Sequence, residues 1–157
     1  MGRPIDARDW IFEVNDATAE CETWLPIENL TSFTHNPGEN EETADTTTFD
    51  SRGYYEQDVM QRGATIELEG QYAIDPRTGE QMPGQAYVDH VWTPQVGIDS
   101  RNLVRWRHRS QDRWAVWEAT VTPDEQGGEV NDKTSWQATF TRCARPYWAP
   151  VCVEVAA

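Results

Sequence analysis

Hydrophobic and polar residues alternate with a period of two along most of this chain, which is typical of β-strands that bury one face. The alternation predicts strands at residues 10–14, 21–30, 102–109, 113–122 and 134–142. The clearest strand is 64–74, with Ala64, Ile66, Leu68, Tyr72 and Ile74 on its apolar face and Thr65, Glu67, Glu69 and Gln71 on its polar face. The chain is therefore expected to build a sheet with one packed face and one wet, partly acidic face.

One helix is expected, at about residues 83–92. Pro83 suits the first turn of a helix, and Pro94 ends it because the residue before a proline disfavours the helical conformation. Tyr87 and Val91 would form an apolar pair one turn apart. So short a helix must cover a sheet to be stable. The pattern predicts a mainly β fold: two packed antiparallel sheets, as a sandwich or an open barrel, with one short flanking α-helix.

Two segments depart from this alternation. Residues 34–60 are polar, acidic and rich in turn-forming residues, and so long a connection inside a compact domain is usually functional or disordered. We expect its threonines, Thr46 to Thr48, to pair as a strand when a partner arrives. Residues 146–157 predict an extended C-terminal arm, with a short strand at 151–155. The domain itself is expected to span residues 1–145.

The net charge of −14 changes the picture by excluding whole classes of partner. Residues 1–60 hold 14 acids and 3 bases, whereas residues 61–157 hold 13 acids and 10 bases, so the first part carries a net −11 and the second −3. A protein that grips nucleic acid needs a basic surface, and anionic membranes also repel this charge. No apolar run is long enough for a membrane span. The charge suits a protein that stays soluble at high copy number or lets a polyanion pass.

No arrangement of residues predicts catalysis, a metal or a cofactor. His35, His90 and His108 are far apart and share no ligand spacing. Nucleophile elbows, phosphate loops and dinucleotide fingerprints are absent from the sequence. The three cysteines, Cys21, Cys143 and Cys152, are odd in number, so we expect reduced thiols, with a Cys143–Cys152 disulfide as the alternative.

Other assignments stay open at this stage. Glu67 and Glu69 could form a glycosidase-type carboxylate pair, although a solvated strand face is the simpler interpretation. His108 shares a face with Trp106 and is expected to be a hydrogen-bonded core histidine. The tryptophans could stack on sugars in a carbohydrate-binding module, but their alternation with small apolar residues favours a buried core: Trp92, Trp106, Trp114, Trp117 and Trp136.

The order of these elements resembles the tail tube proteins of long-tailed bacteriophages across nearly the whole chain. The most specific stretch is Asp-Thr-Thr-Thr-Phe-Asp-Ser-x-Gly at residues 45–53. It is followed by the strand at 64–70 and by closing strands at 117–122 and 136–141. The sequence departs from the family at residues 142–146, where a glycine-containing turn is common.

The resemblance implies a structural protein of the virion tail, made in the host bacterial cytoplasm. Such a subunit forms hexameric rings that stack into a helical tube, through which DNA passes without specific binding. Its other partners would be tape-measure, tail terminator and distal tail proteins, with no membrane and no cofactor. The alternatives are a tail completion or head-to-tail joining protein of related fold, or a carbohydrate-binding module.

Site residues follow from the resemblance together with the charge pattern. We expect the lumen to be lined by Thr65, Glu67, Glu69, Gln71, Ser135, Gln137, Thr139 and Thr141. Docking between rings is assigned to the loop 34–60, with Glu39, Glu41, Glu42, Asp45, Thr46, Thr47, Thr48, Phe49, Arg52, Tyr54 and Tyr55. The face with Arg105, Arg107 and Arg109 should lie outside the tube or be neutralised by acids of a neighbouring subunit.

Overall fold

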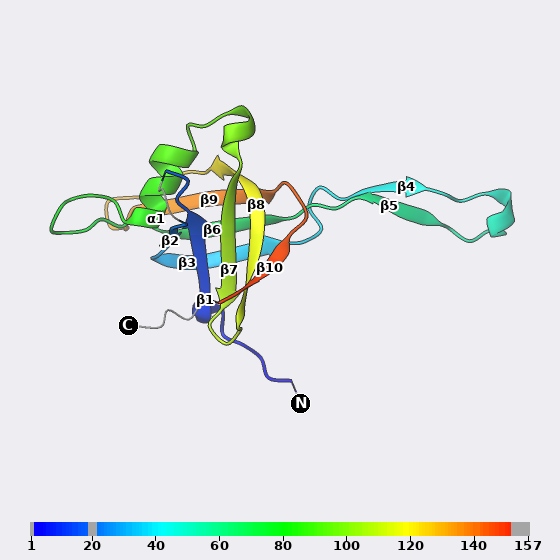
Figure 1. Ribbon diagram of the computed structural model, residues 1–157, viewed down its shortest axis with the longest axis horizontal. Coiled ribbons are helices and arrows are strands. Elements are labelled where there is room, and N and C mark those ends of the chain that lie inside the picture. The colour runs from blue at the N-terminus through cyan, green and yellow to red at the C-terminus, as the bar shows by residue number, and fades with distance from the viewer. Residues whose placement is uncertain (1, 19–21, 152–157) are drawn as a thin grey trace.

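The computed structural model describes residues 2–18 and 22–151, and Figure 1 shows its arrangement. Its strands are β1 (Trp10–Asn15), β2 (Trp24–Pro26), β3 (Leu30–Asn36), β4 (Glu42–Asp45), β5 (Gln57–Gln61), β6 (Thr65–Gln71), β7 (Asn102–His108), β8 (Arg113–Pro123), β9 (Ser135–Arg142) and β10 (Tyr147–Pro150). The helix α1 (Pro83–Ala86) continues as a π-helix, Tyr87–Trp92, and short 3-10 helices lie at Ala7–Asp9, Phe49–Ser51 and Gly97–Ser100. None of the helices in this part of the chain is long and apolar enough to cross a membrane.

One antiparallel sheet folds over to make both layers of the body. Its strand order is β2-β1-β7-β8-β9-β6-β3, and β10 pairs with β8 beside this path. The first residues of β8 pair with β7 and β10, whereas its last residues, 119–123, pair with β9. In Figure 1, β1 and β7 therefore run across β3, β6 and β9. The prediction of a mainly β fold with two packed antiparallel layers and one flanking helix is confirmed.

The core lies between the two layers. The first layer consists of β2, β1, β7, β10 and the start of β8, and the second of β3, β6, β9 and the end of β8. Phe12, Val14 and Val104 come from the first layer and are buried against Leu68 and Phe140 of the second. Strands β1 and β3 share no ladder, yet the Phe12 and Phe33 rings lie 5.2 Å apart between centroids. This side of the molecule is closed by side chains instead of backbone hydrogen bonds, so the body is a sandwich open along one seam.

The helix begins at Pro83 as predicted and remains helical to Trp92. Its second part is a π-helix, and it ends where the Thr93 amide donates to the Val88 carbonyl. The wider turn directs Trp92 into the core, where its ring stacks on Phe140 with centroids 5.3 Å apart. The helix thus covers the sheet through apolar contact, as so short a segment requires.

Two strand predictions were wrong in detail. Residues 21–30 do not form one strand: β2 ends at Pro26, and β3 begins at Leu30 after Asn29 adopts the left-handed conformation, φ 63°. Pro26 does lie on an edge strand, as its missing amide hydrogen requires. The strand predicted at 64–74 ends at Gln71, so Tyr72 and Ile74 are exposed instead of packed.

The segment 34–60 is not an unpaired loop, which corrects the sequence-based expectation: residues 34–36 belong to β3, and the rest forms a β-hairpin. Strands β4 and β5 pair antiparallel as a separate two-stranded sheet, with Ala44 opposite Asp58. Residues 46–48 lie outside both strands, although the Thr46 amide still donates to the Glu56 carbonyl of the opposite arm at 3.0 Å. Figure 1 shows the hairpin projecting far from the body, beyond the ends of β3 and β6.

The C-terminal arm also differs from the prediction. Tyr147–Pro150 is a strand that pairs with β8 of the same chain and extends the first layer. The short strand predicted at 151–155 lies almost wholly outside the described residues, as do Cys21 and Cys152. Cys143 is half-buried, and its thiol donates to the Thr141 carbonyl at 3.6 Å.

Gln85 is a fully buried polar side chain that joins the helix to both neighbouring segments. Its amide nitrogen donates to the carbonyls of Glu28 and Gln71, and its oxygen accepts from the Ala73 amide at 3.1 Å. We predict that Gln85→Leu lowers the free energy of unfolding by about 2 kcal/mol, because these buried backbone groups lose their partner. Urea unfolding followed by circular dichroism measures this.

The matched control is Gln95→Leu, which removes an exposed side chain after the same helix. We expect that change to stay within about 0.5 kcal/mol. Equal stability of the Gln85 and Gln95 variants would contradict the bridging role.

Candidate functional site

A continuous polar surface covers the outer side of the second layer. Because opposed residues of an antiparallel pair share a face, the register assigns its members row by row. The first row is Asn36, Thr65, Thr141 and Thr120; the second is Thr34, Glu67, Thr139 and Thr122; the third is Ser32, Glu69 and Gln137. We call these residues, with Gln71 and Ser135 opposite each other at the end, the polar sheet face. It presents hydroxyl, amide and carboxylate groups to solvent.

The polar sheet face contains acids and no bases. Its two carboxylates are Glu67 and Glu69, both exposed. Among residues 30–36, 65–71, 119–123 and 135–142, the only basic side chains are His35 and Arg142. His35 lies opposite Ile66 and Arg142 opposite Ala119, so both belong to the core side of the sheet. The strand alternation therefore separates positive from negative groups across one layer.

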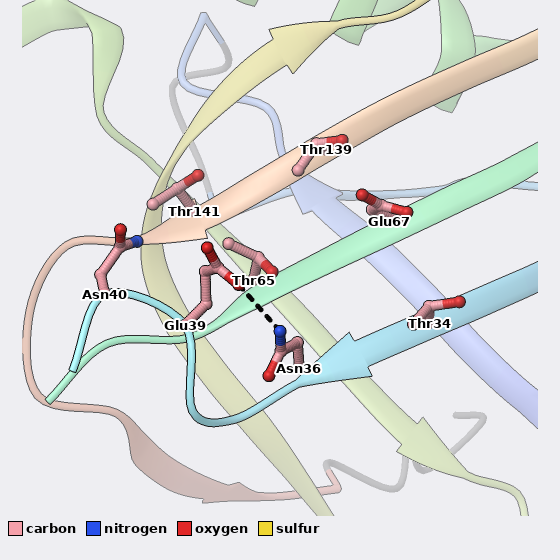
Figure 2. Close-up of a pocket in the computed structure, with 8 residues that line it drawn as sticks. All are labelled: Thr34, Asn36, Glu39, Asn40, Thr65, Glu67, Thr139 and Thr141. Atoms are coloured by element: carbon pink, nitrogen blue, oxygen red, sulfur yellow. Dashed lines mark hydrogen bonds between the residues drawn. The ribbon is translucent and has the colours of Figure 1, made fainter.

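An open hollow of about 380 Å³ lies where this face meets the root of the hairpin, as Figure 2 shows. Glu39 and Asn40 from the hairpin root close it on one side, and Asn36 donates to the Glu39 carboxylate at 2.8 Å. The rest of its lining is Thr34, Thr65, Glu67, Thr139 and Thr141. Within the described residues, no group of three or more His, Cys, Asp or Glu side chains could hold a metal ion. The hollow offers hydration and negative charge.

Glu67 and Glu69 do not form an enclosed pair. Both lie on the open sheet surface, and Glu69 accepts a hydrogen bond from Ser32 Oγ at 3.2 Å. This arrangement fits the simpler interpretation, in which both carboxylates lie on a solvated strand face.

The eight residues predicted to line a lumen all share this one face: Thr65, Glu67, Glu69, Gln71, Ser135, Gln137, Thr139 and Thr141. Sequence reasoning missed five further members: Ser32, Thr34, Asn36, Thr120 and Thr122. For three of them the sequence does contain the strand pattern, because Ser32, Thr34 and Asn36 alternate with Phe33 and His35. The five residues fall outside the prediction because the sequence predicts a strand over residues 21–30 and a loop over residues 34–60 and assigns 113–122 from its apolar residues alone.

The hairpin carries the residues predicted for docking, and most of them are solvent-exposed. At its tip, Phe49 is 103% exposed and Tyr54 is 78% exposed. The turn is made by Arg52 and Gly53, both with positive φ. The Thr47 backbone amide donates to Asp45, and this hydrogen bond lowers the pKa of the Asp45 carboxyl.

The hairpin root is a place of close backbone approach. A Cβ atom at Gly63 would lie 2.6 Å from the Glu39 carbonyl oxygen, so only glycine fits there. Gln61 Nε2 donates to the Asn40 carbonyl at 2.7 Å, and Arg62 pairs with Glu41 at 3.5 Å. These contacts join the two arms at the base of the hairpin, while residues 41–62 contribute nothing to the core.

On the arginine face, Arg105 has an ion-pair partner within the chain. Its Nη2 lies 2.6 Å from the Glu13 carboxylate. Its guanidinium carbon also lies 4.3 Å and 4.2 Å from the ring centroids of Trp24 and Trp114. Arg107 covers the same Trp114 ring at 4.9 Å. Trp114 is therefore enclosed by guanidinium groups, which is incompatible with a flat sugar-binding platform at this residue.

The remaining aromatic predictions concern the core. Trp92, Trp117 and Trp136 are buried, and Trp106 packs against that core. His108 is 4% exposed, with its ring nitrogens 2.6 Å from Ser110 Oγ and 2.9 Å from the Asp6 carbonyl oxygen. The interpretation of His108 as a satisfied core histidine is confirmed.

Comparison with solved structures identifies the architecture. One chain, from the tail of an empty gene transfer agent particle with C6 symmetry, superposes with a TM-score of 0.65 at 15% identity. The match covers 93% of this chain and 99% of that one. The chain has the fold of a gene transfer agent tail protein. A chain from the native virion of a gene transfer agent gives a TM-score of 0.63 with the same identity and coverage.

No family model matches the sequence, and no curated protein does either. The gene transfer agent tail fold is therefore shown by structure alone. At the level of the fold, the predicted resemblance to tail tube proteins is confirmed.

His35 lies on the core side of the second layer. Its ring lies 5.0 Å from Trp106 and 5.4 Å from Trp117, between ring centroids. Burial lowers the pKa of His35 below 6.5, and the nearby positive charge of Arg142 lowers this pKa further. Because the folded state favours neutral imidazole, its stabilising contribution is present above pH 6.5 and is lost as pH falls through the lower folded pKa.

We therefore predict that His35→Gln weakens the loss of stability between pH 7.5 and pH 5. Urea unfolding at both pH values, for wild type and variant, measures the two pH slopes. Identical slopes would show that the His35 imidazole does not carry this pH dependence.

Proposed function

We propose that this protein is the structural subunit of a viral-type tail tube, assembling as stacked hexameric rings whose lumen conducts DNA. The observation that carries the proposal is the polar sheet face, which is acidic, hydroxylated and free of bases, on the fold of a gene transfer agent tail protein. Tape-measure, tail terminator and distal tail proteins are its expected partners in a virion.

The strand arrangement supports ring closure. Within the described chain, β3 pairs only with β6, so its other edge is free to pair with another copy. Four strands carry the polar sheet face: β3, β6, β9 and the end of β8. Six copies would give roughly 24 strands, and ~4.8 Å spacing gives a diameter of about 37 Å before tilt widens it. A DNA duplex can pass such a channel.

The charge arrangement supports passage without binding. Lys and Arg contacts to phosphate would hold DNA and make its release salt-dependent. The two carboxylates, Glu67 and Glu69, repel phosphate, whereas Thr65, Thr139 and Thr141 keep the wall hydrated. Arg142 and His35 are kept on the opposite side of the layer, away from the DNA.

The hairpin is the candidate docking element between rings. Its tip exposes large apolar side chains on a segment that stabilises no part of the core. Such exposure is explained if a neighbouring copy covers the tip in the assembly.

The lumen assignment predicts the effect of charge reversal. Glu67→Lys with Glu69→Lys should leave tube assembly intact but impair DNA delivery, because two lysines per subunit would bind phosphate. Particle assembly is scored by negative-stain microscopy and delivery by transfer of a marker gene. The matched control, Glu80→Lys with Glu125→Lys, makes the same charge change on exposed loops outside the polar sheet face. Normal delivery by the Glu67/Glu69 variant would refute the lumen assignment.

The docking assignment predicts the effect of removing the hairpin. Replacing residues 43–60 by Asn-Gly joins Glu42 to Gln61, its register partner, through a two-residue turn. The shortened protein should keep its unfolding midpoint, since the hairpin supplies no core residue. Sedimentation should detect no tubes. Tubes like those of the wild type from this folded variant would eliminate the docking role.

A further inference from the structure

The chain has one strongly basic stretch, and the fold exposes part of it. Residues 101–113 contain five arginines and a single acid, Asp112. Arg105 is already paired with Glu13, but Arg113 is exposed, and its guanidinium carbon lies 4.0 Å from the centroid of the Trp148 ring. Positive charge remains available where β8 meets β10.

The same place carries exposed aromatic groups. Tyr147 is 50% exposed and Trp148 is 54% exposed, both on β10, and Arg145 precedes them in an exposed position. In the described part of the chain, neither Arg113 nor Arg145 takes part in an ion pair. We call Arg113, Arg145, Tyr147 and Trp148 the basic β10 edge. Figure 1 shows β10 at the side of the body from which the hairpin projects.

Backbone pairing at this edge is restricted. Pro146 precedes β10 and Pro150 ends it, so the strand lacks amide hydrogens at both places. A partner that adds a strand here would find few donors. Recognition at the basic β10 edge must therefore depend mainly on its side chains.

The hairpin has the complementary chemistry. Residues 39–62 hold seven acids and two bases, a net charge of −5. Glu56 and Asp58 are exposed, two positions apart, and belong to no ion pair within residues 2–18 and 22–151. Tyr54 and Tyr55 precede them and are also exposed. Tyrosine rings are favourable partners for guanidinium groups.

We propose that the basic β10 edge is the surface on a second copy of this chain that receives the hairpin, with Glu56 and Asp58 meeting Arg113 and Arg145. This inference rests on the proposed docking role of the hairpin and names its receptor. Like charge disfavours the opposite end of the body, because residues 72–82 and 124–134 together hold six acids and two bases. The apolar patch of Val96 and Ile98 is exposed but offers no charge of its own.

The test exchanges charge between the two surfaces in the full-length chain. One variant, Arg113→Glu with Arg145→Glu, reverses the edge, and a second, Glu56→Arg with Asp58→Arg, reverses the hairpin. Each should lose tubes in sedimentation and negative stain, because both contacts become repulsive. Mixed together, the two variants should form tubes again, since each hairpin then meets an edge of opposite charge. The matched control, Arg77→Glu with Lys133→Glu, should assemble like the wild type.

Each outcome bears on one claim. Tubes from the edge variant alone, or no tubes from the mixture, would overturn the receptor assignment while wild-type tubes still support the tail tube function. Equal loss in the control would also overturn the assignment, because total charge would then explain the effect. Absence of tubes from the wild type would defeat the proposed function. Selective pairing of the two variants in size-exclusion chromatography would then test the contact by itself.

Discussion

A strand that belongs to two sheet layers at once determines how this protein is built. The eleven residues of β8 pair with β7 and β10 at one end and with β9 at the other, so the sheet must fold over along this strand. The fold-over places the apolar sides of both layers against each other. It leaves the alternate residues of the second layer facing outward as one surface, and the polar sheet face is a direct consequence.

The same alternation separates charge. In β3, β6 and β9, residues that face the core include His35 and Arg142, whereas the outward residues carry hydroxyl, amide and carboxylate groups. A shift of one residue in any of these strands would exchange the two sets. Buried Leu68 and Phe140 oppose such a shift, because it would expose them. Core packing therefore maintains the electrostatic character of the outer face.

The sequence predicted the parts that bury one side and failed where nothing is buried. The strands at 65–71 and 135–142 were predictable because alternate residues enter the core, and those at 102–108 and 113–123 because they are rich in apolar residues that pack in the core. The hairpin strands β4 and β5 lack that signal, since both their faces meet solvent and their pairing uses backbone groups, so the pattern predicts a loop there. Tyr72 and Ile74 extended the apolar alternation beyond the end of β6 without packing. Most of the polar sheet face was predictable, but its contribution from β8 required the register.

The continuity of backbone from the body into the hairpin has a mechanical consequence. Strands β3 and β6 lead directly into its two arms, through the fixed base at Gly63 and Gln61. A pull on the tip therefore acts lengthwise on two adjacent strands, and their hydrogen bonds to each other and to β9 share the load in shear. In a stacked assembly, bending would stretch these ladders in parallel instead of opening them one bond at a time. If the polar sheet face lines a channel as proposed, the same wall would also be the tension-bearing element of the filament.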